Sequence, residues 1–535
     1  MGTVGRIIVL VLIVLVAVFV LSTIGEAAPV TRVRAVVGVH QEFDLGKVKA
    51  VLGQFGSIER EIPEIGVIVL SVSKNSVDHI RGFSFTRYVE EDVVLELGSK
   101  SSSKSSGVSK PRVSIADYTK ELTIAVEDQG EVYFTIKNVG KVDVLVVVEL
   151  RNERGVAVAR TDTIALPAGF SYSGKLGFTA PSTAGTYSWT LAVVDSSGGG
   201  SVYASATVTV KVVAPTPETP SPPSDSTTYN DTIGWNVQII NATKVWAMST
   251  QYGDSAYGYS VAVQLAIVDT GIDYTHQDLA GAVVWCVASL SGTLYRGSDI
   301  SQCADPNGHG THVAGIAAAR LNNWGIAGVA PKVVLYAVRV LDSSGRGYAS
   351  DIARGIVEAV KGPDGVVGTD DDADVISMSF GGGSSSVLYD AIRYAYSAGV
   401  VLVAAAGNSG GSTPLCPACY PEVIAVGAVD KYYSVPSWSN RNPDVVAPGS
   451  GVLSTWPGNR HVVASGTSMA CPHVSAAIAL AQAMRLASGR QKLTPAQMME
   501  VTRSTALDLG SPGYDQESGY GLVDVYALVL RSSTL

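Results

Sequence analysis

The sequence is poor in charged residues, and this scarcity narrows the classes of protein that it can encode. Only 16% of the 535 residues are Asp, Glu, Lys or Arg, against 46% that are hydrophobic, which argues against disorder over most of the chain. Basic residues number 38 against 47 acidic ones, giving a net charge of −9. A nucleic-acid partner is therefore not expected. The length exceeds that of one ordinary domain.

Long apolar runs are also missing, except for residues 7–21 near the N-terminus. Small residues follow at 25–28, which is the layout of an export signal. We expect residues 1–28 to be a signal peptide, the protein to be secreted, and membrane contact to occur only during export. The alternative is an uncleaved membrane anchor, since the run is short for a span.

Cysteine is scarce, and all five cysteines lie in the C-terminal half. An exported chain keeps disulfides, so we expect Cys286 to pair with Cys303 and Cys416 with Cys419, which leaves Cys471 free. A zinc site is the alternative, but only one pair has the close spacing that zinc ligands show.

Two polar stretches divide the chain into units. Residues 98–110 are mostly Ser, Lys and Gly, and residues 214–227 are rich in Pro, Thr and Ser, so both read as linkers. They separate three expected folded units, at 29–97, 111–213 and 228–535.

The first two units have different patterns. Residues 29–97 alternate strand-like and helix-like stretches in the order β-α-β-β-α-β, which predicts a small α+β, ferredoxin-like domain. Residues 111–213 alternate apolar and polar positions between turns, which predicts an immunoglobulin-like β-sandwich. That second unit contains no His and no Cys, so catalysis and zinc binding are not expected there. It binds substrate, a surface or a partner, or it is a spacer.

The third unit alternates short apolar runs with helical patterns. Runs such as 264–268, 333–341, 375–378 and 400–406 are typical of strands buried on both faces. We expect an α/β fold with a doubly wound, mostly parallel sheet, and chemistry at the carboxyl ends of its strands.

Three glycine-flanked segments of this unit carry a carboxylate, an imidazole and a hydroxyl. Asp269 lies in Val-Asp-Thr-Gly, His309 in Gly-His-Gly-Thr-His, and Ser468 in Gly-Thr-Ser-Met-Ala. A serine hydroxyl becomes a good nucleophile when an imidazole takes its proton and a carboxylate holds that imidazole. An aspartic peptidase would need a second Asp-Thr-Gly or Asp-Ser-Gly, and a zinc peptidase of the His-Glu-x-x-His kind would need that motif. The sequence has neither.

Two further features surround the expected nucleophile. A long helical pattern begins next to Ser468, and because Pro472 is tolerated in a first turn, the serine is expected at a helix N-terminus, where negative charge is favoured. Asn408 follows a buried strand in Ala-Gly-Asn-Ser-Gly. Its alternative role is that of an ordinary turn residue.

The order Asp, His, Ser in these segments resembles the subtilisin-like serine peptidases, or subtilases. The resemblance implies a secreted, monomeric serine endopeptidase with a subtilisin-like fold, acting on proteins or peptides through an acyl-enzyme. It also implies a precursor in which residues 29–97 are an inhibitory propeptide.

The resemblance assigns roles residue by residue. Asp269, His309 and Ser468 are the catalytic trio, and Asn408 donates to the oxyanion together with the backbone amide of Ser468. Substrate-binding positions are Gly345, Arg346, Gly347, Ser379, Phe380, Gly381, Ala406 and Gly407. Arg346, at the rim, is expected to favour acidic side chains.

Calcium is the cofactor that the resemblance implies. One expected site is the acidic loop with Asp364, Asp370, Asp371, Asp372 and Asp374, whose alternative is a solvated acidic turn. A second family site comprises Asp278, Leu321, Asn323 and Ile326, completed by Asp231. The loop of this second site departs from the family pattern by a small shift.

One departure from the family concerns maturation, because the β-unit stands between the propeptide and the catalytic unit. If the tail 94–97 fills the cleft, self-cleavage falls near Leu97-Gly98 and the β-unit is retained. Cleavage in 214–226 would discard it. Two rival functions remain, a non-catalytic adhesion protein, which would need a degraded trio, and an esterase or acyl transferase.

Overall fold

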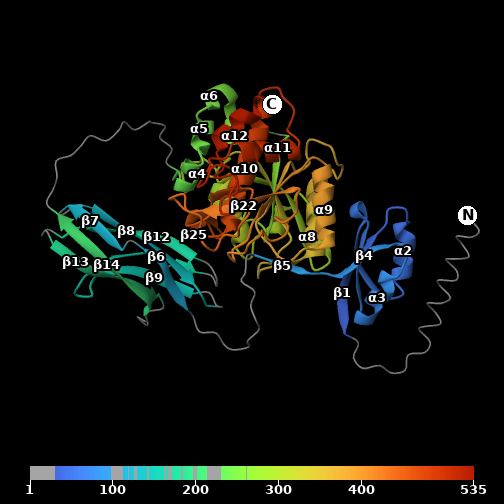
Figure 1. Cartoon of the computed structure of the whole chain (residues 1–535), viewed down its shortest axis with the longest axis horizontal. Coiled ribbons are helices and arrows are strands. Elements are labelled where there is room, and N and C mark those ends of the chain that lie inside the picture. The colour runs from blue at the N-terminus through green and yellow to red at the C-terminus, as the bar shows by residue number, and fades with distance from the viewer. Residues whose placement is uncertain are drawn as a thin grey trace, which may run out of the picture.

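Valine, isoleucine and alanine fill the strands of the C-terminal unit, and the computed structural model buries them in one eight-stranded sheet (Figure 1). The structure describes residues 31–97, most of 112–213, and 231–535 apart from residue 261. The expected signal and the two expected linkers lie outside the described residues. None of the helices in the described part is both long and apolar enough to cross a bilayer.

The large sheet has the order β17-β16-β18-β15-β20-β21-β22-β23. All neighbours pair in parallel except β16 and β17, which confirms the expected α/β fold with a mostly parallel sheet. Its strands are β15 (Gln264–Asp269), β16 (Val283–Leu290), β17 (Thr293–Gly297), β18 (Val334–Arg339), β20 (Val375–Met378), β21 (Val401–Ala405), β22 (Val423–Val429) and β23 (Val445–Pro448).

Helices cover both faces of this sheet. One face packs against α7 (His309–Ala318) and α10 (Thr467–Ala487), and the other packs against α8 (Ala349–Lys361) and α9 (Ser386–Ser397). The remaining elements are α4 (Trp235–Ile239), α5 (Ala242–Trp246), α6 (Ser249–Tyr252), η2 (Gly253–Tyr257), η3 (Gln277–Leu279), η4 (Ile300–Cys303), β19 (Arg346–Tyr348), β24 (Val452–Trp456), β25 (Arg460–Ala464), α11 (Pro495–Ser504) and α12 (Val525–Ser532). Both expected disulfides are present, Cys286–Cys303 and Cys416–Cys419, and Cys471 is free and buried.

The N-terminal unit is a four-stranded antiparallel sheet in the order β2-β3-β1-β4, packed against two helices. Its elements are β1 (Arg32–Val39), α2 (Leu45–Leu52), β2 (Gly56–Ile62), η1 (Pro63–Ile65), β3 (Val67–Ser73), α3 (Lys74–Arg81), β4 (Thr86–Glu91) and β5 (Val94–Glu96). The last of these, β5, leaves the unit and pairs with β19 of the C-terminal unit (Figure 1).

Carboxylates of the N-terminal unit cap the N-termini of two helices of the C-terminal unit. Glu90 accepts the N–H groups of Ser386 and Val387 at the start of α9. Asp92 accepts the N–H and the hydroxyl of Ser350 at the start of α8. These amides have no partner within their helices, and the positive end of each helix favours the carboxylate.

Ion pairs join the same two units at a buried cluster. Arg60 pairs with Asp351 at 2.5 Å, and Arg34 pairs with Asp92 at 2.9 Å. Asp351 is 1% exposed and therefore has little contact with water. Arg60 and Arg34 of the N-terminal unit supply positive charge beside it. Burial of such charges needs well-aligned partners, and these contacts therefore fix how the N-terminal unit docks.

The β-unit consists of two facing sheets, β10-β9-β13-β14-β7 with β11 beside β9, and β12-β8-β6. Apolar side chains such as Phe134, Leu150 and Trp189 fill the space between them. The strands are β6 (Val113–Tyr118), β7 (Glu121–Ala125), β8 (Gln129–Asn138), β9 (Val144–Arg151), β10 (Ala157–Arg160), β11 (Ile164–Leu166), β12 (Ser171–Thr179), β13 (Gly185–Asp195) and β14 (Val202–Val213). Strand β12 lies beside β25 (Figure 1).

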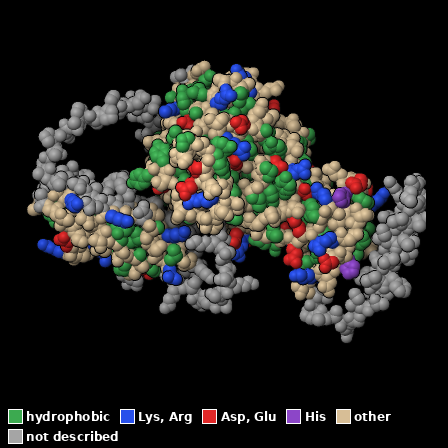
Figure 2. Space-filling model, viewed as in Figure 1, with side chains coloured by type: hydrophobic (Ala, Val, Ile, Leu, Met, Phe, Trp, Pro, Cys, Tyr) green, Lys and Arg blue, Asp and Glu red, His purple; other side chains and the backbone are tan. Residues whose placement is uncertain are grey.

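Acidic and basic side chains are interspersed over the face of the molecule that Figure 2 shows. The described residues form no broad basic surface on that face. This agrees with the excess of acidic residues in the sequence.

Candidate active site

Asp269 is the last residue of β15, is fully buried, and holds the imidazole of His309. The Nδ1 atom of His309 lies 2.9 Å from both Oδ1 and Oδ2 of Asp269. The N–H of Thr270 donates to Oδ1 at 2.7 Å. The carboxylate is thus fixed by the backbone that follows the strand, and it fixes the ring in turn.

The loop before His309 is ordered by a residue that the sequence did not single out, Asp305. Its Oδ1 accepts from the Thr270 hydroxyl and from the N–H of Gly308, and its Oδ2 accepts the N–H and the hydroxyl of Thr311. One carboxylate therefore ties the segment after Asp269 to the start of α7. The only local signal was an acidic residue at a loop-to-helix junction.

Glycine is required next to the histidine. Gly308 has φ +107°, and a Cβ there would lie 2.4 Å from the ring of Trp456. A Cβ on Gly310 would lie 2.1 Å from the carbonyl oxygen of Gly271. These close approaches bring the start of α7 against Trp456 of β24 and against the segment that follows β15.

His312, one turn further along α7, has a different environment. Its Nε2 lies 2.9 Å from the Val462 carbonyl. Burial lowers the pKa of His312 to about 3, so the ring is neutral near pH 7 and serves as packing and a hydrogen-bond donor.

Ser468 is the second residue of α10 and is buried. Its Oγ donates to the Ser379 carbonyl at 2.9 Å, and the Ser379 hydroxyl donates to the Ser468 carbonyl at 2.8 Å. Pro472 stands in the second turn of α10, not in the first turn as the sequence predicted. Because proline has no N–H, the Ser468 carbonyl loses its usual helical partner, and the Ser379 hydroxyl replaces it.

Asn408 follows β21 and faces the start of α10. Its Oδ1 accepts the N–H of Thr467 at 2.8 Å and the Thr467 hydroxyl at 2.9 Å. The Thr467 hydroxyl also accepts the N–H of Gly407. With Oδ1 fixed in this way, the amide nitrogen Nδ2 of Asn408 is turned toward Gly466. A Cβ added to Gly466 would lie 3.2 Å from this nitrogen. Thr467, which orients Asn408, is not among the residues that the sequence patterns indicated.

The tail of the N-terminal unit lies between the two segments expected to bind peptide. Glu96 and Gly381 exchange backbone hydrogen bonds of 3.4 and 3.2 Å, and the N–H of Leu97 donates to the Gly345 carbonyl at 3.0 Å. The side chain of Arg346 pairs with Glu96 at 3.0 Å. Leu95 is fully buried in the cluster that contains Phe380.

Two other expected substrate positions lie on the neighbouring loop. The Ala406 carbonyl accepts the N–H of Leu415. Gly407 has φ +111°, and a Cβ there would lie 3.0 Å from the Leu415 side chain. Gly347 follows Arg346 in β19 and pairs with Leu95. The structure thus brings all eight expected substrate residues to one region around the tail and Ser468.

Three of the five acidic residues expected to bind calcium in this loop form a group, and the other two lie apart from it. Carboxylate oxygens of Asp364, Asp371 and Asp372 all lie within 4.8 Å of one another. Asp370 is exposed and outside this group. Asp374 pairs with Lys492 at 2.5 Å, and burial raises its pKa to about 6, so it does not belong with the other three.

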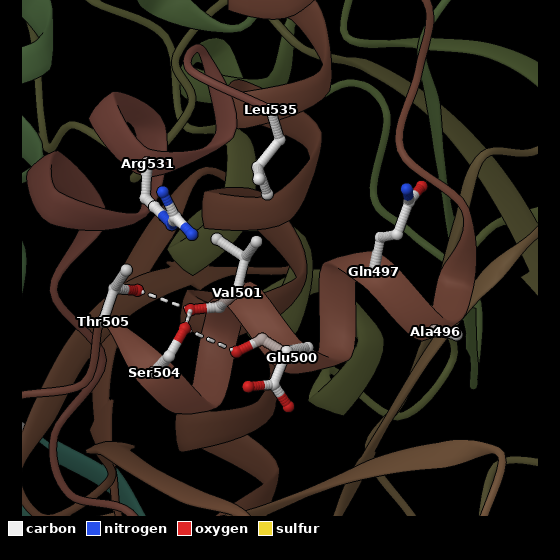
Figure 3. Close-up of a pocket in the computed structure, with 8 residues that line it drawn as sticks. All are labelled: Ala496, Gln497, Glu500, Val501, Ser504, Thr505, Arg531 and Leu535. Atoms are coloured by element: carbon white, nitrogen blue, oxygen red, sulfur yellow. Dashed lines mark hydrogen bonds between the residues drawn. The ribbon is translucent and has the colours of Figure 1, made fainter.

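A pocket elsewhere in the C-terminal unit plays no part in this arrangement. Figure 3 shows it beside α11 and α12, and its polar lining residues are Gln497, Glu500, Ser504, Thr505 and Arg531. The Ser504 and Thr505 hydroxyls donate to backbone carbonyls of α11. None of the eight lining residues belongs to the expected site.

Fold and site together define a serine endopeptidase of the Asp–His–Ser type. A sequence model described as the subtilase family matches residues 260–521. Subtilisin DY of Bacillus licheniformis is 42% identical over 304 residues, which are 55% of this chain and 98% of that protein. The chain belongs to the subtilase family.

Other relatives match over different lengths. Thermophilic serine proteinase of Bacillus sp. (strain AK1) is 45% identical over 258 residues, 47% of this chain and 59% of that protein. Thermitase of Thermoactinomyces vulgaris is 43% identical over 244 residues, 44% of this chain and 78% of that protein. The chain therefore spans less than two thirds of the first protein and most of the second.

Replacement of Asn408 and Thr467 tests the orienting contact. Asn408→Ala is expected to lower kcat by roughly 10²–10³ with little change in KM, a magnitude measured for this kind of donor in subtilisin itself. Thr467→Val is expected to lower kcat about five- to tenfold, since one of two hydrogen bonds to Oδ1 is lost, and Thr467→Ser to lower it less. Steady-state kinetics on a peptide substrate measure these effects.

The double variant is the control for this prediction. If Thr467 acts by orienting Asn408, then Thr467→Val has little further effect on kcat in the Asn408→Ala background. Fully multiplicative losses would show that Thr467 acts independently.

Proposed function

We propose that this chain is a secreted serine endopeptidase, made as a self-processing precursor and stabilised by calcium. The observation that carries the catalytic part is the buried His309 imidazole, held 2.9 Å from both oxygens of Asp269. With its Nδ1 proton committed to Asp269, the Nε2 atom carries the lone pair that accepts the proton of Ser468. For this transfer the Ser468 hydroxyl turns away from the Ser379 carbonyl, to which it donates in the absence of substrate.

The reaction follows in two halves. Ser468 Oγ attacks the peptide carbonyl, and its proton passes to His309 Nε2. The C–N bond then breaks, the amine leaves with the proton from His309, and an acyl ester remains on Ser468. Water, deprotonated by His309, attacks the ester. The C–O bond to Ser468 then breaks, Oγ takes the proton back from His309, and the acid is released. Asp269 orients the imidazole and stabilises its protonated form.

Negative charge on the carbonyl oxygen is stabilised at the start of α10. The backbone N–H of Ser468 and the Nδ2 of Asn408 are the two donors, and the positive end of the helix adds to them. The fixed position of Asn408 Oδ1 against Thr467 supports this role. Donors held in advance need no reorganisation when the charge develops.

Ser468→Ala tests the activity. The variant is expected to lose about four to six orders of magnitude in kcat, the range known from such trios, subtilisin included. Casein digestion and labelling by a fluorophosphonate measure it beside the unaltered chain. Casein digestion that persists in Ser468→Ala, after removal of contaminating proteases, would refute the assignment.

The contacts of the N-terminal unit support its role as an inhibitory propeptide. The tail of this unit adds a strand to β19, and its backbone hydrogen-bonds to Gly381. Two carboxylates of the unit cap the N-termini of α8 and α9. A peptide held in this way blocks the approach of other chains to Ser468. The ion pair of Glu96 with Arg346 also supports a preference for an acidic residue at this position of a substrate.

The register of the tail supports one maturation bond. Antiparallel partners keep a constant sum of residue numbers, and Glu96 pairs with Gly381. Ser379, whose carbonyl receives the Ser468 hydroxyl, stands two positions before Gly381, so we expect the bond that is cut to follow the second residue after Glu96. Gly98 lies outside the described residues, and we propose cleavage after it, one bond beyond Leu97-Gly98.

N-terminal sequencing of purified active enzyme tests this bond. Ser99 is expected as the first residue, with the β-unit retained, while Ser468→Ala remains uncleaved at this position. A start at Gly98 would contradict the register, and a start within 214–226 would show that the β-unit is discarded. The mass of the intact mature chain provides the matched control.

The three carboxylates Asp364, Asp371 and Asp372 fit calcium. Calcium takes oxygen ligands, and here three carboxylates offer oxygens within 4.8 Å of one another. Two N–H groups, those of Asp364 and Gly368, donate to Asp371 and Asp372, but they do not offset the mutual repulsion of three carboxylates, which a cation among them would relieve. When bound there, calcium would tie the loop between α8 and β20 together. It takes no part in the reaction steps above.

Chelation tests the calcium proposal. EDTA is expected to lower the unfolding midpoint of the Ser468→Ala chain, and excess calcium to restore it, because an ion bound by the folded state alone stabilises that state. Calorimetry measures the shift. Asp371→Asn with Asp372→Asn is expected to abolish the response, and an unaltered response in that double variant would place the ion elsewhere.

A further inference from the structure

The loop 321–326 lies between two buried carboxylates that the family resemblance assigned to calcium. Asp278 is 0% exposed and Asp231 is 6% exposed. Both therefore depend on partners supplied by the fold, because a buried carboxylate without partners is strongly unfavourable. The nature of those partners decides whether a cation fits.

Both carboxylate oxygens of Asp231 accept hydrogen bonds from backbone amides of the loop. Its Oδ1 accepts the N–H of Asn322 at 3.0 Å and that of Trp324 at 3.3 Å. Its Oδ2 accepts the N–H of Asn323 at 3.0 Å. Three successive N–H groups thus surround this carboxylate, which is how a protein binds an anion.

Asp278 faces nitrogen as well. Its Oδ2 accepts the N–H of Ile326 at 3.0 Å and lies 2.7 Å from His461 Nε2. The loop backbone closes over the same oxygen, since a Cβ on Gly325, which has φ +68°, would lie 2.3 Å from it. The Gly325 carbonyl is already taken by the N–H of Thr232.

This donor set does not fit calcium. Calcium takes six to eight oxygen ligands at 2.3–2.6 Å, whereas here four loop amides and an imidazole nitrogen point at the two carboxylates. Each N–H carries positive charge on its hydrogen, which repels a cation.

Aromatic rings hold His461 against Asp278. Its ring centroid lies 5.1 Å from that of Trp324 and 5.1 Å from that of His276. His276 uses Nδ1 to accept the N–H of Asp278 and lies with Nε2 2.9 Å from the Arg460 carbonyl. Because both its ring nitrogens are committed, the two histidines and Asp278 do not form a free ligand set for zinc either.

We propose that the loop 321–326 is stabilised without any metal ion, and that His461 takes the place of calcium as the partner of Asp278. Calcium dependence then belongs to the loop with Asp371 and Asp372 alone. The inference shares with the proposed function only its assignment of that acidic loop, and it concerns stability, not catalysis.

The test uses the full chain carrying Ser468→Ala, so that self-cleavage does not interfere. His461→Phe keeps an aromatic ring and removes the donor, and is expected to lower the unfolding midpoint by about 3–8 °C, equally in EDTA and in excess calcium. His461→Gln keeps an N–H donor and is expected to lose less than half as much. An unchanged midpoint in His461→Phe would overturn the proposal.

Calcium and zinc responses complete the test. The rise in midpoint from EDTA to calcium is expected to be the same in the parent, in His461→Phe and in Asp278→Asn, and to vanish in Asp371→Asn with Asp372→Asn. A smaller calcium response in either of the first two variants would overturn the proposal. So would zinc chloride that stabilises the parent but not His461→Phe.

The two calcium assignments fail separately. If the parent shows no calcium response while His461→Phe is destabilised, the acidic-loop proposal is refuted and the metal-free loop 321–326 is supported. If Asp278→Asn does not fold, the variants His461→Phe and His461→Gln still test the proposal. His461 lies on β25 with 19% of its side chain exposed, so it tolerates replacement more readily than the fully buried Asp278.

Discussion

Parallel pairing of β15, β20 and β21 is the constraint on which the site depends. Parallel strands end at the same edge of a sheet, so Asp269, Ser379 and Asn408, which end or follow these strands, are delivered to one place. The helices α7 and α10 begin at that edge with His309 and Ser468 in their first turns. A sheet with one of these strands reversed would scatter the same side chains.

Unsatisfied groups at element ends provide the second organising principle. Helix starts offer N–H groups without partners, and this chain fills them with carboxylates from distant segments, such as Asp92 at α8 and Glu90 at α9. Inside the catalytic unit, Asp305 and Asp231 do the same for loops. Docking of the N-terminal unit, in addition to its buried ion pairs, and order in the catalytic loops thus use the same kind of interaction.

The sequence indicated the parts of the molecule that carry strong local patterns. Buried strands appear as apolar runs, so β15, β20 and β21 were found close to their bounds, and both disulfide pairs were correct. Features with weak local patterns were predicted wrongly or were not predicted at all. Pro472 was placed in the first turn because the replacement of its missing bond by Ser379 depends on a residue 93 positions away. Thr467 and Asp305 were missed because hydroxyls and carboxylates at loop ends are common, and their partners are visible only in three dimensions.

What the sequence determined by itself is the chemistry available, namely a carboxylate, an imidazole, a hydroxyl and an amide in glycine-flanked segments, together with the strand pattern that implies their meeting at one edge. What only the tertiary structure decided is how polar groups are paired, including which acidic side chains face nitrogen donors and which face each other. The reason is physical. The type of a side chain fixes what it is able to bind, whereas the choice among available partners depends on distances between segments far apart in the chain.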